Sequence, residues 1–582
     1  MKKQDSIPRP EHPRPQFLRP EWINLNGTWS YAFDPGLSGG ERGLHLATGF
    51  PQKITVPFCP ESPLSGVRHV DFIPAIWYHR TIRIPAAWRG RRVLLHFGAV
   101  DYECEAYVDG APAGRHIGGA ASFSFDITGL VKPGGTHHLV VHAVDDTRSG
   151  SQMLGKQSQS YHSAGCMYTR TTGIWQTVWL EAVHPQGLKA VHVIPDACGG
   201  SFTFIPAYHE IMPGRQFRAV VHDHAHVVAE GRASAAQGAA VTVKIPNPKL
   251  WSPCTPFLYD IVFQVIDQRG RVIDEAASYA GMRTVDVAGN QVHLNGEPVY
   301  LRLVLDQGFY PDGIWTAPSD AALKGDIELA MRAGFNGARL HQKVFEERFH
   351  YWADRLGYLT WGESPSWGMK LPGGPAAYNF LNEWREIIQR DRNHPSLIAW
   401  TPFNETSGKH GGFDARLQCD AYHLTKALDP TRPVNDASGW SHTLTDLFTV
   451  HTYEQSPARL RKSLAKTADG GVWAWAPQPQ VAYAGQPYIV DEFGGIKWIP
   501  RRHRAFSDRS WGYGNAPKSE QEFYARLEGL VDAILAHKHI CGFCYTQLTD
   551  VEQEQNGIYN YNRTRKFDMK HIARIFRKTQ PR

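Results

Sequence analysis

The sequence lacks long apolar runs: none of its 582 residues belongs to a stretch approaching the ~18–20 apolar residues that cross a membrane. Its start, MKKQDSIPRPEHPRPQ, has two lysines but no apolar core, so we predict no secretory signal. Cysteine is scarce, with eight irregularly spaced residues, which favours reduced thiols and a cytoplasmic location. The net charge of only +6 argues against a nucleic-acid or acidic-membrane binder, which needs a concentrated basic patch.

The remaining composition is that of a large folded protein. Hydrophobic residues make up 42% and charged residues 20% of the chain, so an extensive core can be buried. At roughly 100–200 residues per domain, the length predicts about three to five domains. We find no internal repeat and no low-complexity segment.

The first half of the sequence predicts β-structure. We interpret residues 1–15, which are rich in proline, as an N-terminal arm. Residues 16–183 contain short alternating runs broken by Gly, Pro and Asp, a pattern typical of a jelly-roll sandwich. Residues 184–284 contain further strands and no convincing helix, which predicts an immunoglobulin-like sandwich.

From residue 285 to 582 the pattern alternates between buried strands and amphipathic helices. One helix is predicted to begin at Ser319, another to end at Gly357, and a third to begin with a capping box from Ser519 to Glu522. About eight strand–helix repeats in this length predict a (β/α)8 TIM barrel. The fold class is therefore multidomain, with a jelly-roll sandwich, an immunoglobulin-like sandwich and a TIM barrel.

Two glutamates follow buried strands of the predicted barrel. Glu405 ends AWTPFNE after the fourth strand, and Glu492 ends YIVDE at the seventh. Active sites of such barrels lie at the carboxyl ends of the strands, so both carboxylates are expected at the same mouth. Paired carboxylates are what glycoside cleavage needs, one as proton donor and the other as nucleophile or base. The alternative is that they are helix caps or ion-pair partners.

The chain resembles glycoside hydrolase family 2, which includes β-galactosidases and β-glucuronidases. The resemblance rests on LNGTW (25–29), TTGIWQTVWLE (171–181) and RDRNHPSLIAWTPFNE (390–405), the last matching the acid/base signature. It implies Glu405 as general acid/base and Glu492 as nucleophile. It also implies retention of anomeric configuration, with the carboxyl groups ~5–5.5 Å apart.

The same resemblance and the strand-end positions give a set of substrate-binding residues. Asn404 is expected to bind the sugar 2-hydroxyl, and Tyr453 to hydrogen-bond the nucleophile. Further candidates follow the barrel strands: Asp306, Arg339, His341, Glu363, His451, Trp361, Trp498 and Gln547. Asp306 is a candidate ligand of sugar hydroxyls. Trp361, Trp498 and Trp367 are candidate walls of the pocket. Arg339 is alternatively a structural partner of a catalytic glutamate.

Departures from the family pattern bear on the substrate. The Asn-x-Lys with which family β-glucuronidases hold the sugar carboxylate is replaced here by Glu554 and Asn556, and a glutamate would repel a uronate. We therefore expect exo-cleavage of a neutral β-pyranoside, first a β-galactoside. A β-glucuronidase, another β-hexosidase and a transglycosylase of the same family remain alternatives, as does a carbohydrate-binding protein that does not hydrolyse.

No cofactor is expected, and we see no dedicated metal-ligand cluster. The expected partner is a carbohydrate, and a homo-oligomer is expected by analogy with the family. His222, His224 and His226 are predicted to share one face of a solvated edge strand, with zinc the less favoured reading. Cys541 and Cys544 form a CxxC that we interpret as core cysteines rather than a redox pair.

Overall fold

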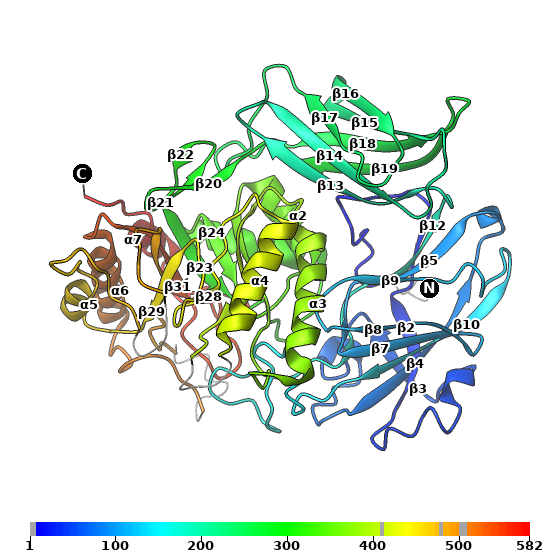
Figure 1. The fold of residues 1–582 in the computed structure, drawn as a ribbon. Helices are drawn as coiled ribbons and strands as arrows, with labels where there is room; N and C mark the ends of the chain where they lie inside the picture. The colour runs from blue at the N-terminus through cyan, green and yellow to red at the C-terminus, as the bar shows by residue number, and fades with distance from the viewer. Residues whose placement is uncertain (1–6, 408–412, 476–480, 500–508, 582) are drawn as a thin grey trace.

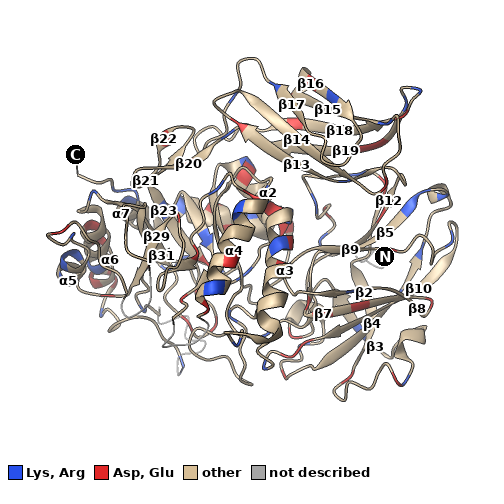
Figure 2. Ribbon diagram, in the orientation of Figure 1, with Lys and Arg blue, Asp and Glu red and all other residues tan. Residues whose placement is uncertain are grey.

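The computed structural model describes residues 7–407, 413–475, 481–499 and 509–581. Three parts lie side by side, two made of strands and one of alternating strands and helices (Figure 1). Acidic and basic residues are interspersed over all three parts (Figure 2). Among the described residues, no helix is both long enough and apolar enough to cross a bilayer.

The first β part consists of two antiparallel sheets facing each other. One has the strand order β1-β12-β5-β9 and the other β3-β2-β4-β10-β7-β8. Buried side chains of both sheets, among them Trp29, Leu95 and Val141, form the core between them. Its elements are β1 (Trp22–Asn24), β2 (Gly27–Phe33), η1 (Leu44–Leu46), β3 (Gln52–Val56), η2 (Pro63–Ser65), β4 (Ala75–Arg83), η3 (Ala86–Trp88), β5 (Arg92–Phe97), β6 (Val100–Asp101), β7 (Glu103–Val108), β8 (Ala111–Ile117), β9 (Phe123–Asp126), β10 (Thr136–Val144), β11 (Gly173–Ile174) and β12 (Val178–Val183).

The second β part also pairs two antiparallel sheets, β13-β14-β17 and β16-β15-β18-β19, around an aromatic core. Its strands are β13 (Leu188–Asp196), β14 (Ser201–Tyr208), β15 (Gln216–Asp223), β16 (His226–Ser234), β17 (Val241–Lys244), β18 (Tyr259–Ile266) and β19 (Val272–Ala280). A small sheet of β20 (Val285–Ala288), β21 (Gln291–Leu294) and β22 (Glu297–Pro298) leads into the third part.

The third part is a barrel of parallel strands in the order β26-β25-β24-β23-β31-β30-β29. The predicted weak fifth strand is reduced to a parallel bridge between Trp400 and Val434 and the short pair β27–β28. The elements are β23 (Leu301–Asp306), α1 (Asp320–Ala333), β24 (Gly337–Leu340), α2 (Glu347–Leu356), β25 (Leu359–Glu363), α3 (Gly374–Asp391), β26 (Leu397–Thr401), β27 (Phe403–Asn404), α4 (Ala415–Leu428), β28 (Ala437–Ser438), β29 (Phe448–Thr452), α5 (Pro457–Ser463), β30 (Tyr488–Gly494), α6 (Glu520–Leu535), β31 (Ile540–Thr546) and α7 (Met569–Phe576).

The helix boundaries follow the capping residues that the sequence provides. The side chain of Ser319 accepts a hydrogen bond from the Ala322 amide at the start of α1, and Gly357 ends α2 in the left-handed conformation. Ser519 likewise caps α6 by accepting from the Glu522 amide. The Glu522 carboxylate, however, accepts from the Lys518 amide instead of the Ser519 amide, so the capping box is displaced by one residue.

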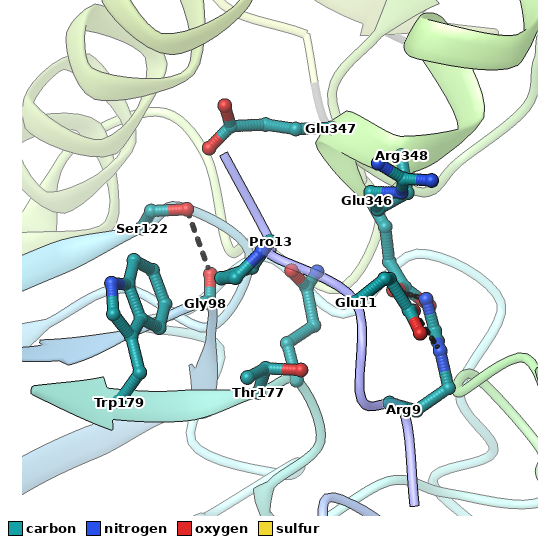
Figure 3. Close-up of a pocket in the computed structure, with 11 residues that line it drawn as sticks. Arg9, Glu11, Pro13, Gly98, Ser122, Thr177, Trp179, Glu346, Glu347 and Arg348 are labelled. Carbon is teal, nitrogen blue, oxygen red and sulfur yellow. Dashed lines mark hydrogen bonds and ion pairs between the residues drawn. The ribbon is translucent and has the colours of Figure 1, made fainter. Parts of the chain in front are cut away.

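The first described residues run between the first β part and the barrel. Arg9 is 3% exposed and donates to Glu346 Oε1 at 2.8 Å, while its Nε is 2.6 Å from Glu11 (Figure 3). The Asn24 side chain donates to the Arg9 carbonyl at 2.8 Å. This segment therefore joins two parts of the chain through buried contacts.

The histidine prediction is wrong in its geometry. His222 lies near the end of β15, His224 lies in the turn with φ of 53°, and His226 begins β16. The hairpin reverses the chain between them, so the three side chains do not share one face of a strand. Cys541 and Cys544 are both buried on β31, as the core interpretation expects.

Candidate active site

Glu405 and Glu492 come together at the mouth of the barrel. Glu405 directly follows β27, and Glu492 lies in β30. One carboxylate oxygen of each lies within 4.8 Å of the other, and a ring nitrogen of His451 lies within the same limit of both. Glu405 adopts φ of 51°, a left-handed conformation that is uncommon outside glycine, and its amide donates to Ser438 at 2.9 Å. This turn directs the Glu405 side chain back over the barrel, and strain of this kind is often found at functional positions.

Glu492 is held in its ionised form by its partners. Arg339 donates to Oε1, and the Tyr453 hydroxyl donates to Oε2. Burial alone would raise the pKa of Glu492, but His451 and Arg339, together with the Tyr453 bond, hold that pKa well below its usual range. A buried carboxylate that stays charged is chemically suited to act as a nucleophile.

Arg339 organises the charges beneath the pair. It is fully buried and donates to Glu363, to Glu492 and, at 3.2 Å, to Asn404 Oδ1. His341 Nδ1 lies 2.9 Å from Glu363 Oε1, and burial lowers the pKa of His341, so this imidazole is neutral. Both terminal nitrogens of Arg339 are thus used on Glu363, Glu492 and Asn404, which makes Arg339 a positioning group for Glu492 and Asn404.

His451 lies between the two glutamates. Its Nδ1 is 2.7 Å from Glu405 Oε1 and 3.5 Å from Glu492 Oε2, and its Nε2 is 2.9 Å from the Ser438 hydroxyl. Burial lowers the pKa of His451, but the carboxylates of Glu492 and Asp491 and the bond to Glu405 raise it to about 9. The imidazole therefore carries a positive charge at neutral pH.

Glu405, His451 and Glu492 form the one cluster of possible metal ligands found in the described part of the chain. An imidazole must be neutral to ligate a metal, whereas His451 is protonated and hydrogen-bonded to Glu405. The donor set therefore fits a hydrogen-bonded trio better than a metal centre.

Asn404 carries an unused donor at the mouth. Its Oδ1 accepts from Arg339, its carbonyl accepts from the Trp367 indole at 3.0 Å, and its Nδ2 has no hydrogen-bond partner among the described residues. Gln547 is similar: its Nε2 donates to Asn556 at 2.8 Å, and its buried Oε1 has no partner there. Buried polar atoms without partners are rare in folded proteins and indicate groups kept free for a ligand.

Three predicted substrate-binding residues lie away from the pair. Leu301, Leu303 and Leu305 of β23 face the barrel interior, and alternation turns Asp306 to the helix side with Val304. Burial and the nearby Asp326 of α1 raise the pKa of Asp306 to about 7.

The two tryptophans pack in apolar surroundings. Trp361 is fully buried in the interior core, where its indole donates to Thr401 at 2.7 Å. Trp498 packs 6.2 Å from Phe523 and 6.4 Å from Phe567, next to α6. The third candidate, Trp367, donates its indole N–H to the carbonyl of Asn404, the residue before Glu405.

The segment between β10 and β11, residues 145–172, contributes residues that the barrel pattern does not predict. We call it the insertion loop. Its Leu154 and Gly155 amides donate to the carbonyls of Trp367 and Pro365 at 2.8 and 2.9 Å. Lys156 and Tyr168 of this loop reach the barrel: the Lys156 ammonium lies 4.2 Å from the Trp367 ring centre, and Tyr168 donates to Glu554. The loop lacks regular structure, so no periodic pattern marks its residues as part of the site.

Comparison with known proteins identifies the family. Residues 215–283 match the model of glycosyl hydrolases family 2, and residues 285–495 match the model of the TIM barrel domain of that family. The chain belongs to glycoside hydrolase family 2. This confirms the family that the sequence motifs indicated and the TIM barrel of residues 285–495.

Relatives within the family carry two different names. A β-galactosidase of Thermoanaerobacter pseudethanolicus is 26% identical over 74% of this chain and 58% of the relative. A β-glucuronidase of Paenibacillus borealis is 24% identical over 72% of this chain and 73% of the relative. The chain thus spans little more than half the length of the first of them.

The fold is shared with a solved β-glucuronidase of Ruminococcus gnavus. The two structures superpose with a TM-score of 0.80 over 97% of this chain and 98% of that chain, at 20% sequence identity. At this identity the likeness establishes the arrangement of the three parts and leaves the substrate open.

Proposed function

We propose that this family 2 protein is a retaining exo-β-glycosidase that acts by double displacement. The observation that carries the proposal is the approach of the Glu405 and Glu492 carboxylate oxygens to within 4.8 Å. Retaining glycosidases place their carboxyl groups about 5–5.5 Å apart, whereas inverting enzymes need about 6.5–9.5 Å to admit a water molecule.

In the first step, a Glu492 oxygen attacks the anomeric carbon while the bond to the leaving oxygen breaks. Glu405 gives its proton to that leaving oxygen. The low pKa of Glu492 keeps the nucleophile ionised. Tyr453 and Arg339 hold the two oxygens of the nucleophile in place.

In the second step, Glu405 takes a proton from water, whose oxygen attacks the anomeric carbon and releases Glu492. Glu492 loses its charge in the glycosyl-enzyme and regains it when water releases the sugar. His451 Nδ1, 2.7 Å from Glu405 Oε1, holds the carboxyl group of Glu405 in place during this step.

We propose a neutral pyranose as the sugar, with a β-galactoside first. The free Asn404 Nδ2 is suited to the 2-hydroxyl, and Glu554 occupies the position where a family β-glucuronidase would have the asparagine of its Asn-x-Lys. Contacts of the insertion loop with Trp367 and Glu554 beside the mouth support a terminal sugar and hence exo-cleavage.

Cytoplasmic location and a homo-oligomer stay predictions, as do the jelly-roll and immunoglobulin-like assignments and the domain limits 1–15, 16–183, 184–284 and 285–582.

A panel of p-nitrophenyl glycosides that varies sugar and anomer tests the proposal. We expect turnover of the β-galactoside, with retained configuration in the first product. Glu492→Gln should abolish turnover, and Glu405→Ala should spare substrates with good leaving groups. A 2-deoxy-2-fluoro glycoside should add the mass of one sugar at Glu492.

The alternatives give different results. Full activity of both glutamate variants would refute the catalytic assignment. Calorimetric binding of oligosaccharides without turnover of any glycoside would indicate a carbohydrate-binding protein. Preference for the glucuronide would reverse the sugar assignment, and products extended by an added acceptor would indicate transglycosylation.

A further inference from the structure

Lys156 of the insertion loop is a buried lysine whose ammonium forms no hydrogen bond or ion pair among the described residues. Three lysines are buried in the described part of the chain, and two of them have clear structural partners. Lys343 donates to the carbonyls of Gly308 and Trp315 at 2.6 and 2.7 Å, and Lys566 pairs with Asp550 at 2.7 Å. Lys156 is 6% exposed, and its ammonium lies 4.2 Å from the centre of the Trp367 ring, with the Cys166 thiol among its electrostatic neighbours. The ammonium has three N–H donors and forms no hydrogen bond or ion pair with the described residues, so these donors are available to a ligand.

The fold fixes the position of Lys156 tightly. The preceding Gly155 has φ of +59°, and a side-chain carbon there would lie 2.2 Å from the Gln342 carbonyl. The Lys156 carbonyl accepts from the Tyr168 amide at 2.7 Å. The side chain of the following Gln157 donates to Asp101 at 2.7 Å. The loop is therefore docked on the barrel at the residue that carries the ammonium.

Lys156 faces the catalytic carboxylates. Trp367, over which the ammonium lies, is bonded to the carbonyl of Asn404, the residue before Glu405. Burial lowers the pKa of Lys156, but Cys166 and the carboxyl groups of Glu554, Glu492 and Glu405 together raise it above its usual value. The ammonium is thus charged and lies within electrostatic reach of three carboxyl groups.

Glu554 lies on the other side of this region. It is 2% exposed; one oxygen accepts from Tyr168 and the other from Asn556 at 3.1 Å. Each oxygen of a carboxylate can accept a second hydrogen bond. Lys156 and Glu554 interact electrostatically, but no ion pair joins them within the described chain. This donor and this acceptor are therefore not used on each other, and a ligand can bridge them.

We propose that Lys156 and Glu554 bind adjacent hydroxyl groups of a terminal neutral pyranose. The ammonium donates to one hydroxyl oxygen, and the neighbouring hydroxyl donates to the carboxylate. These hydroxyls are distinct from the 2-hydroxyl, which Asn404 binds. This inference rests on the proposed glycosidase function and gives its sugar specificity a physical origin. An anionic sugar group at Lys156 is disfavoured because it would also approach Glu405, Glu492 and Glu554.

Deoxy substrates test this proposal. The aryl β-glycoside that the wild-type enzyme cleaves fastest is compared with its 3-, 4- and 6-deoxy analogues, in wild type, Lys156→Met and Glu554→Gln. Each variant should lower kcat/KM for the parent substrate about 10- to 100-fold, equivalent to ~1.4–2.8 kcal/mol. Wild type should cleave the parent substrate faster than each deoxy analogue, and each variant should lose this preference for one analogue. The analogue affected by Lys156→Met and the one affected by Glu554→Gln should lack neighbouring hydroxyls. Lys370→Met, at an exposed lysine of the barrel segment that contacts the same loop, should match wild type.

Binding in the Glu492→Gln background gives a readout without turnover. Adding Lys156→Met should raise the Kd of the intact glycoside. Circular dichroism and thermal unfolding check that the variant keeps its fold. If Lys156→Met does not fold, Lys156→Gln replaces it. Unchanged discrimination by both variants, or a selective loss of glucuronide cleavage in Lys156→Met, would overturn the hydroxyl assignment. Absence of wild-type turnover with every glycoside would instead refute the proposed function.

Discussion

The charged His451 between the two glutamates makes stability depend on pH in a defined window. Its pKa is raised from 6.5 to about 9 in the folded protein, mainly by Glu492 and Asp491 against the effect of burial. A group with a raised folded pKa stabilises the fold fully below its unfolded pKa and loses that contribution as pH rises through the folded pKa. At about 1.4 kcal/mol per pKa unit, the shift corresponds to roughly 3 kcal/mol.

The assay compares the free energy of unfolding in denaturant for wild type and His451→Gln from pH 6 to pH 10. The stability advantage of wild type should shrink by roughly 3 kcal/mol between pH 6.5 and pH 9 and then level off. His350→Gln is a matched control in the same barrel, because burial lowers the pKa of His350 to about 3. His350 is neutral in the fold throughout this window, and its unfolded form is neutral well above 6.5, so that variant should give a constant difference from about pH 7.5 to pH 10. A constant difference for His451→Gln as well would refute the charge assignment.

Three further perturbations follow from the contacts. Tyr453→Phe removes the hydroxyl that donates to Glu492. Because a hydrogen bond to a charged group contributes ~1.5–3 kcal/mol, kcat on an aryl glycoside should fall about 10- to 100-fold. An unchanged kcat would contradict this role. Glu383, whose pKa burial raises to about 8, accepts from the Ala120 amide at the contact between α3 and the first β part. Because the pKa of Glu383 is higher in the folded than in the unfolded protein, the fold loses stability as pH rises from the unfolded pKa through about 8. Glu383→Gln should therefore unfold at a higher temperature than wild type at pH 9 and at no higher temperature at pH 4. Gly155→Ala places a carbon against the Gln342 carbonyl and should lower kcat/KM by displacing Lys156, whereas Gly129→Ala, with open space around it, should match wild type in a steady-state assay.

The sequence was informative where a local rule carries over to three dimensions. Glu405 and Glu492 follow separate strands of one parallel barrel, and strand ends of such a barrel meet at one mouth. The helix starts at Ser319 and Ser519 depend on side chains that cap the backbone within a few residues. Strand alternation also places Asp306: the interior leucines at 301, 303 and 305 put it on the other face of β23, and its role as a sugar ligand stays a prediction.

Other features depend on contacts that no local pattern encodes. Lys156 lies in a loop without helix or strand, and its role arises from docking on Trp367 and Pro365 of the barrel. The three histidines of HDHAH alternate as they would in a strand, but φ of 53° at His224 turns the chain into a hairpin there. Trp361 lies on a barrel strand, as the sequence pattern predicts, yet its side chain packs in the apolar interior of the barrel.

The docking of the insertion loop makes assembly of the parts a condition for recognition of the sugar. A barrel released from the first β part would keep both glutamates, Arg339 and Tyr453, because all four belong to barrel segments. It would lose the ammonium of Lys156 and the tyrosine bonded to Glu554. On the proposed assignment, part of the selectivity is thus encoded outside the barrel. Exchanging residues 145–172 between relatives is then expected to change which sugars are accepted without altering the groups that break the bond.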